Sequence, residues 1–135
     1  MTDSEVLSFI VPRFDTAWTH TPIEYSNNRL ETEGLPEWVR LTVKPSASRK
    51  IGFDEKARRF GTVHIQVFVR IGTGQGRPME LAVLAGEIFG GVISGSLVFD
   101  SYIIYDVGES VAMGLNTVKS GWYQMNVSID YSFID

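Results

Sequence analysis

The stretch that decides the fold is RFGTVHIQVFVRIGTGQGRPMELAVLAGEIFG, Arg59–Gly90. Its first half places apolar side chains at the odd positions of Val63–Ile71 and mostly polar ones at the even positions of Thr62–Arg70. A period of two is typical of a strand with one buried face. The alternation stops at Gly72–Gly76, and an apolar stripe with helical spacing follows over Pro78–Phe89, with proline in the first turn. The stretch therefore predicts a long strand, a glycine-rich turn and a helix.

The end of the chain repeats the period of two. Residues Trp122–Phe133 alternate again, with Tyr123, Tyr131 and Phe133 on the apolar side, where core packing explains them. Weaker extended patterns predict further strands elsewhere in the chain, at Ile23–Tyr25, Trp38–Val43, Arg49–Phe53, Ser96–Phe99 and Tyr102–Val107. The segments between them contain turn residues and predict loops or interruptions, at Asn27–Pro36, Pro45–Ser48, Asp54–Lys56 and Glu109–Ser120.

A second helix is predicted near the N-terminus, over Asp3–Trp18. Val6, Ile10 and Phe14 recur at four-residue spacing, and Asp3 or Ser4 can cap the first turn. Pro12 lies inside the pattern and predicts either a kink or a later start of the helix.

The order of these elements predicts an α+β fold. We expect a mainly antiparallel, twisted sheet with two helices packed on one face, because the connections are too short for repeated strand–helix–strand crossovers. Residues 1–135 are expected to form a single domain, since no repeat, low-complexity tract or linker divides the chain.

Composition excludes several classes of function. The chain has no cysteine, so disulfides, thiolate metal sites and cysteine nucleophiles are absent. Acidic residues Asp3 and Glu5 stand where a signal peptide would be basic. The apolar run Leu81–Phe99 approaches the length of a membrane span, but its glycines and Glu87 favour the end of a helix, a turn and a strand.

The charge is distributed unevenly along the chain. The net charge is −4, yet half of the twelve basic residues fall in one predicted hairpin, which contains Lys44, Arg49, Lys50, Lys56, Arg58 and Arg59. The rest of the chain is strongly acidic, which disfavours nonspecific binding of nucleic acid. The basic hairpin is either a solvated loop or a contact surface for an acidic partner.

No catalytic constellation accompanies the scaffold. The glycines of Gly72–Gly76 suggest a phosphate-binding turn, but Arg77 stands where a dinucleotide loop needs its third glycine, and the Lys-Ser/Thr pair of a P-loop is absent. His64 lacks a histidine or carboxylate two or four positions away, and Ser94 is off the spacing of a nucleophile elbow. We therefore expect no enzyme activity, no metal and no cofactor.

Two tryptophans are placed unusually. Trp38 and Trp122 fall on the side of their strands opposite to the aliphatic residues. That side is covered either by a helix or by another subunit, and exposed aromatic residues in a line are a sign of an interface. Trp38 and Trp122 therefore join the six basic residues as candidates for a subunit or partner interface.

The chain resembles the tail terminator-like proteins of long-tailed bacteriophages and prophages. The similarity lies in WVRLTV (Trp38–Val43), the basic hairpin, GTVHIQVFV (Gly61–Val69), the Gly72–Gly76 turn into a helix, and GWYQMNVSI (Gly121–Ile129). The N-terminal helix followed by Thr21–Tyr25 also fits, whereas Ser94–Ser120 matches no part of the pattern.

The resemblance implies a structural virion protein without catalytic residues. Such proteins form a ring, usually of six subunits, at the head-proximal end of the tail, after assembly in the bacterial cytoplasm. The ring caps the tail tube, ends its polymerisation and presents the surface that joins the head connector. Its partners would then be copies of itself, the tube protein and the connector, with DNA passing through the lumen and no membrane.

The residues leave two other possibilities open. One is a head–tail neck adaptor located nearer the head. The other is a small enzyme that binds phosphate or a nucleotide at Gly72–Gly76. In the ring, the basic hairpin and the acidic remainder of the chain would be the two complementary patches that a head-to-tail contact needs.

Overall fold

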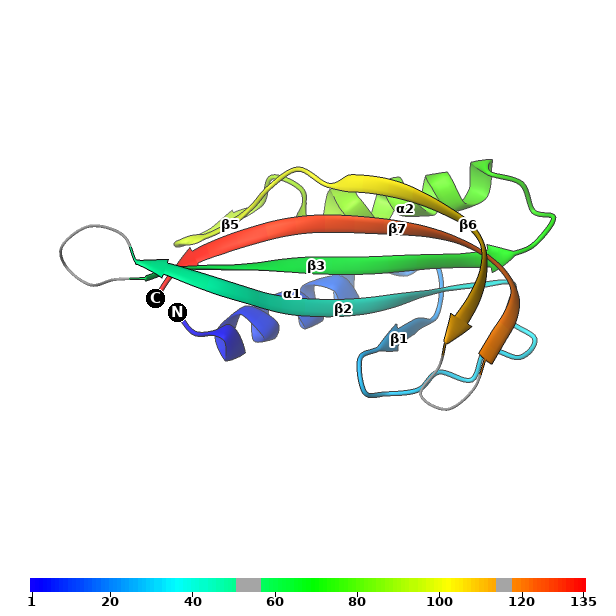
Figure 1. Ribbon diagram of the computed structural model, residues 1–135, viewed down its shortest axis with the longest axis horizontal. Helices are drawn as coiled ribbons and strands as arrows, with labels where there is room; N and C mark the ends of the chain where they lie inside the picture. Colours follow the sequence, from blue (N-terminus) through cyan, green and yellow to red (C-terminus); the bar gives the residue numbers. More distant parts are fainter. Residues whose placement is uncertain (51–56, 114–117) are drawn as a thin grey trace.

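The computed structural model describes residues 1–50, 57–113 and 118–135. Its elements follow one another as α1 (Asp3–Ala17), β1 (Ile23–Tyr25), β2 (Glu37–Lys50), β3 (Ala57–Arg70), α2 (Gly76–Phe89), β4 (Ile93–Ser94), β5 (Leu97–Phe99), β6 (Ile103–Met113) and β7 (Val118–Ile134) (Figure 1). The predicted α+β fold is confirmed: the described strands form one sheet, and β1 alone among them runs parallel to its neighbour.

Strand β3 is the centre of the sheet, between β2 and β7. The predicted hairpin exists, since β2 and β3 are antiparallel neighbours from Glu37 opposite Val69 to Lys50 opposite Ala57. Strand β7 has β3 on one side. On its other side it pairs with β5 near the C-terminus and with β6 over the rest of its length. The two long stretches recognised in the sequence are therefore direct neighbours, Arg59–Arg70 in β3 and Trp122–Phe133 in β7.

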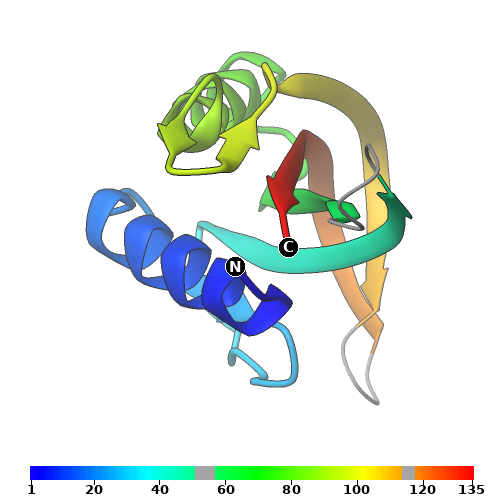
Figure 2. The same cartoon turned by 90° about the vertical axis from the view of Figure 1, so that its left-hand side faces the viewer.

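Both helices cover the same face of the sheet, as Figure 2 shows. Odd-numbered side chains of the long strands, including Val63, Ile65 and Val127, are fully buried beneath them. Phe14 of α1 and Phe89 of α2 stack with their ring centres 6.2 Å apart, which joins the two helices over the sheet. We call the buried cluster between the helices and the sheet the main core.

Helix α1 begins where the sequence predicts, with a different cap. Thr2 is the N-cap, and its Oγ1 accepts a hydrogen bond from the backbone N–H of Glu5 at 3.2 Å. Pro12 lies inside the helix without delaying its start. The burial of Val6, Ile10 and Phe14 stabilises the turns on both sides of the proline. The cap at Asp3 or Ser4 and the later start were therefore wrong predictions.

One predicted interruption is absent, and a second is shorter than predicted. The Pro45–Ser48 segment lies within β2, where only a shift of register between Pro45 and Ser48 marks the proline, so the predicted strand at Arg49 begins as the end of β2. Within Glu109–Ser120, β6 continues to Met113 and β7 begins at Val118. Pairing with a long neighbour and β-bulges extends these strands beyond their weak sequence patterns. The predicted turn Asp54–Lys56 and residues 51–53 of the predicted strand lie outside the described residues.

Two glycines allow aromatic rings to approach the backbone closely. A Cβ at Gly61 would overlap the ring of Tyr131, its direct partner across β3 and β7. A Cβ at Gly86 would overlap the ring of Tyr102, which lies against α2. The run Leu81–Phe99 divides into the end of α2, a turn, β4 and β5, as predicted. In the part of the chain that is described, no helix is long and apolar enough to cross a membrane.

Candidate subunit interface

The basic hairpin is partly neutralised within the chain. Arg59 lies 3.1 Å from a carboxylate oxygen of Asp135 and 3.8 Å from one of Asp3, so it binds both ends of the chain. Arg58 donates a hydrogen bond of 2.8 Å to Oγ of Ser132 on β7. Both arginines therefore have an intramolecular role, and reversing their charge would disturb the fold as well as any interface.

Among the described side chains of the basic set, Lys44 is exposed and Arg58 and Arg59 are half-buried. It lies on β2 opposite Thr62 of β3, beyond which Asp130 of β7 is the next residue across the sheet. The side chains of Arg49 and Lys50, at the end of β2, and the whole of Lys56 lie outside the described residues. Lys44 thus carries the part of the predicted basic surface that the structure allows us to place.

Trp38 and Trp122 are not exposed, so this part of the predicted interface was wrong. Trp38 is fully buried and Trp122 is 2% exposed. Trp38 stacks on Phe68 with ring centres 4.1 Å apart and meets Trp122 edge to face at 5.9 Å. These rings form a second, smaller core on the sheet face opposite the helices, against which Leu30 and Leu35 pack. We call this group the Trp cluster.

The cover of the Trp cluster is the loop between β1 and β2. Glu24, 6% exposed, accepts a hydrogen bond from the backbone N–H of Leu30 at 3.0 Å and one from Nε of Arg40 at 2.7 Å. Arg70 lies over the ring of Trp122 at 3.9 Å and donates to the carbonyl of Leu35 at 3.0 Å. The sequence contained a signal for this cover, since Leu30 and Leu35 are the apolar residues of an otherwise polar loop.

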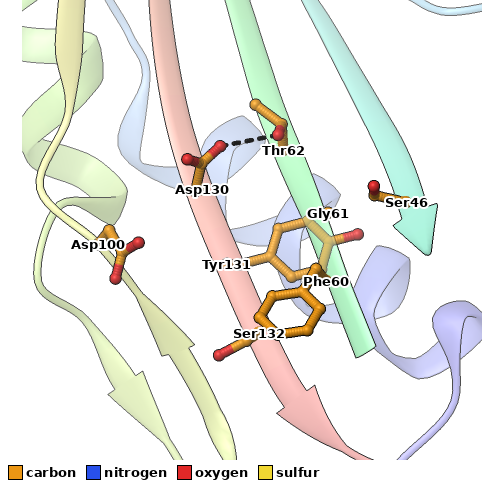
Figure 3. Close-up of a pocket in the computed structure, with 8 residues that line it drawn as sticks. All are labelled: Ser46, Phe60, Gly61, Thr62, Asp100, Asp130, Tyr131 and Ser132. Carbon is orange, nitrogen blue, oxygen red and sulfur yellow. Dashed lines mark hydrogen bonds between the residues drawn. The ribbon is translucent and has the colours of Figure 1, made fainter. Parts of the chain in front are cut away.

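A shallow hollow lies next to Lys44 and was not foreseen. It measures about 280 Å³ and is lined by residues of β2, β3, β7 and the segment after β5, namely Ser46, Phe60, Gly61, Thr62, Asp100, Asp130, Tyr131 and Ser132. Figure 3 shows Thr62 donating to Asp130 across the two central strands, at 2.8 Å. Carboxylates and hydroxyls on an open sheet face suit polar contact with a partner. No group of residues able to hold a metal ion was found among the described side chains.

His64 lies in the middle of this face. Burial is the main cause that lowers its pKa, the positive charge of Lys44 lowers it further, and Asp130 acts in the opposite direction. The imidazole is therefore neutral at neutral pH. The central position predicted for His64 in its strand is correct.

The glycine-rich turn connects β3 to α2 through ordinary turn contacts. Gly72 and Gly74 have φ angles of +94° and +91°, which glycine adopts without strain. The hydroxyl of Thr73 donates to the carbonyl of Arg70 at 2.7 Å, and the amide of Gln75 donates to Asp106 of β6 at 2.8 Å. These contacts give the turn a structural role between the strand, the helix and β6.

Another surface escaped the sequence analysis, along the exposed strand β6. Ile103, Tyr105 and Val107 are 51%, 52% and 47% exposed. Ile103 and Tyr105 lie opposite Ser128 and Asn126, on the sheet face away from the helices. Alternate apolar residues that remain exposed along one strand are the composition expected of an interface. The sequence predicted the strand there, but not its position as an outer strand.

Comparison with known proteins supports the fold without naming a function. No protein-family model and no curated protein matches the chain. A solved structure of another protein is similar to it with a TM-score of 0.65 and 19% sequence identity. The similarity covers 98% of this chain and 96% of that one, so the whole α+β domain has a counterpart of comparable size.

Proposed function

We propose that this chain is a tail terminator-like protein: a structural, non-catalytic subunit of a ring, with six copies as the expected number, that caps a phage tail tube. In this role it ends polymerisation of the tube and provides the surface to which the head connector binds. The protein is then part of the virion, at the head-proximal end of the tail.

The observation that carries the proposal is the order of the elements on which the sequence resemblance rests. The N-terminal helix, the long hairpin of β2 and β3, the glycine-rich turn, α2 and the closing strand β7 occur in that order. The sheet also leaves polar and apolar side chains exposed on one face and along β6, as a subunit that contacts copies of itself requires.

A ring adds a physical requirement, and the charges of this surface support the proposal. Each subunit of a cyclic ring must present two different complementary patches, because its two neighbours contact it on different sides. Lys44 and the acidic residues elsewhere in the chain supply opposite charges for such a contact. Charge complementarity favours the correct register between copies more than it adds to affinity.

The proposal is tested by the growth of tubes in vitro. Purified tube protein is allowed to polymerise with increasing amounts of this chain, and the length of the tubes is measured by electron microscopy. We expect tubes to shorten as the ratio of this chain rises, with one particle at a tube end. An acidic protein of similar size at the same concentration is the control. Tubes that reach full length at every ratio would contradict the proposal and favour the neck adaptor.

The phosphate-binding enzyme is distinguished by a separate measurement. Thermal unfolding is followed with inorganic phosphate and with ATP, for the wild type and for Gly74→Ala. If the turn is structural, neither compound raises the melting temperature of either protein. A ligand-dependent rise that Gly74→Ala abolishes would replace the ring by the enzyme.

A further inference from the structure

We propose that neighbouring copies of this chain join edge to edge, with β6 of one copy lying antiparallel beside the open part of β2 of the next. This inference deepens the proposed ring and rests on it for the number of copies. The occupant of both edges is thus a second copy of the same chain, and the interface is heterologous.

Both edges are open in the described part of the chain. β6 pairs with β7 on one side, and no described strand pairs with its other side. β1 covers β2 only at Val39–Leu41, so the edge of β2 from Thr42 to Lys50 has no described partner strand. An unpaired edge presents a row of backbone donors and acceptors, which another strand can satisfy.

The directions of the strands suit a head-to-tail contact. β2 is antiparallel to β3, β3 to β7, and β7 to β6. It follows that β6 runs opposite to β2 within one sheet. A second copy brought alongside by rotation, without being turned over, therefore presents its β6 antiparallel to β2. This is the relation that a cyclic ring requires between successive subunits.

The charges of the two edges disfavour pairing between two copies of the same edge. Among the described side chains of the two edges, the open part of β2 carries the exposed Lys44, whereas β6 carries the exposed Asp106. Two copies of the same edge would place like charges together, which is unfavourable. Pairing of β6 with β2 avoids this repulsion, because Lys44 lies on the face away from the helices and Asp106 lies on the helix face, where Tyr123 and Gln75 donate to it. A symmetric dimer through either edge alone is thereby disfavoured.

The exposed apolar residues of β6 add area to the contact. Ile103, Tyr105 and Val107 alternate along the strand and are each about half exposed. A neighbouring strand and its side chains would cover these residues, and burial of apolar area is the main favourable term in association. Phe60, which is exposed, lines the hollow on β3 next to the open part of β2.

The backbone pairing must be short. Pro45 has no N–H to donate, the register of β2 shifts between Pro45 and Ser48, and that of β6 shifts after Asp106. Ile103 of β6 is opposite Ser128 of β7, Ser128 is opposite His64 of β3, and His64 is opposite Thr42 of β2. Ile103 and Thr42 therefore lie at the same level of the sheet. The two open edges extend from this level toward opposite ends of the molecule (Figure 1). Successive copies would then be displaced along their strands, which a closed ring accommodates as strand tilt.

Because the chain has no cysteine, single cysteines can report on this contact. Ser46→Cys places a thiol on the exposed edge region of β2, and Val107→Cys places one on β6. The two variants are mixed, treated with a short bis-maleimide cross-linker and separated on a denaturing gel. The reaction is run in solution at high concentration and again on capped tubes. Glu87→Cys, exposed on α2, is mixed with Ser46→Cys as the matched control.

We expect covalent dimers in the mixture of Ser46→Cys with Val107→Cys, and none in either variant alone or in the control mixture. Dimers in one variant alone, with none gained on mixing, would overturn the inference in favour of pairing between like edges. An oligomer by light scattering without cross-linked dimers would overturn the edge contact while leaving the ring. Dimers from open, growing chains would support the edge contact and contradict the closed ring. No dimer in solution or on tubes overturns the inference.

Discussion

The two faces of the sheet are built very differently. On one face, both helices cover the strands, and side chains of β2, β3 and β7 are buried in one main core. On the other face, the described part of the chain covers the end near Trp38 and Trp122, with a loop held by Glu24, Arg40 and Arg70. The remaining part carries Lys44, His64 and the exposed residues of β6.

The difference separates residues that maintain the fold from residues available for contact. Substitutions beneath the helices should change global stability, and those in the Trp cluster should act through its loop. Substitutions on the uncovered part should leave the monomer nearly unchanged and alter association instead. Variants of each region can therefore test whether the two faces have these separate roles.

The largest effect on stability is expected beneath the helices. Phe89→Ala removes a fully buried ring that stacks on Phe14 and contacts Phe99, with ring centres 6.2 and 5.4 Å away. We expect the free energy of unfolding to fall by about 3–5 kcal/mol, because the truncation leaves a cavity in a packed core. Urea denaturation measures the change. A loss below about 1 kcal/mol, typical of surface sites, would contradict the role of this face.

A smaller loss is expected where the loop covers the Trp cluster. Glu24→Gln removes the charge that pairs with Arg40 in a nearly buried position. We expect unfolding free energy to fall by about 1–3 kcal/mol, because a charged hydrogen bond is weakened away from water.

The control for this variant is Glu37→Gln, on the neighbouring strand β2. Glu37 pairs with Arg77 at 2.6 Å, but the Arg77 side chain is 35% exposed, so its loss should cost less than about 1 kcal/mol. Both values come from the same urea titrations. If both variants lost the same free energy of unfolding, burial would not make the Glu24–Arg40 pair more stabilising than the exposed pair.

Substitution on the uncovered part should barely affect the monomer. Ile103→Thr keeps a β-branched residue at a position that is 51% exposed. The free energy of unfolding should change by no more than about 0.5 kcal/mol. Association between copies, measured by sedimentation, should weaken, because less apolar area is buried at the β6 edge. A large loss of stability with unchanged association would reverse the roles assigned to the two regions.

The smallest effect is a loss of stability at acidic pH that we expect from His64. His64 titrates near its ordinary value of 6.5 in the unfolded chain, and burial with Lys44 lowers the pKa in the folded protein. Below this pH, the unfolded chain therefore binds more protons than the folded protein does. The contribution of His64 to the free energy of unfolding is complete above this pH. It is lost as the pH falls toward the lower pKa of the folded protein. His64→Gln should flatten this slope, whereas His20→Gln, which leaves His64 in place, should retain it. An identical slope in His64→Gln and the wild type would exclude His64 as its source.

The elements that form the main core could be predicted from the sequence because their patterns are local. Alternation in Gly61–Val69 and Trp122–Phe133 predicted both long strands, and the spacing in Pro78–Phe89 predicted α2. Local periodicity states which side of a strand is apolar, and here the helices cover that side. The position of Pro12 inside α1 was less predictable, since packing of the surrounding turns outweighs the cost of the proline.

The opposite face could not be predicted in this way. Whether Trp38 and Trp122 are exposed depends on where the loop after β1 lies, and that position is set by contacts between residues distant in sequence, such as Leu35 with Arg70. Likewise, the neutralisation of Arg59 depends on the meeting of both chain ends. The exposure of β6 follows from its position at an edge, which no local pattern of its residues specifies.

The central claim is that this chain forms a ring that caps a tube, and the mass of the native assembly tests it most directly. Light scattering is measured on the free protein over a range of concentrations, and native mass spectrometry on the particle released from tube ends. The account predicts a discrete assembly with six copies as the expected number, in solution or at the tube end. A monomer at every concentration that also fails to bind tube ends would contradict it.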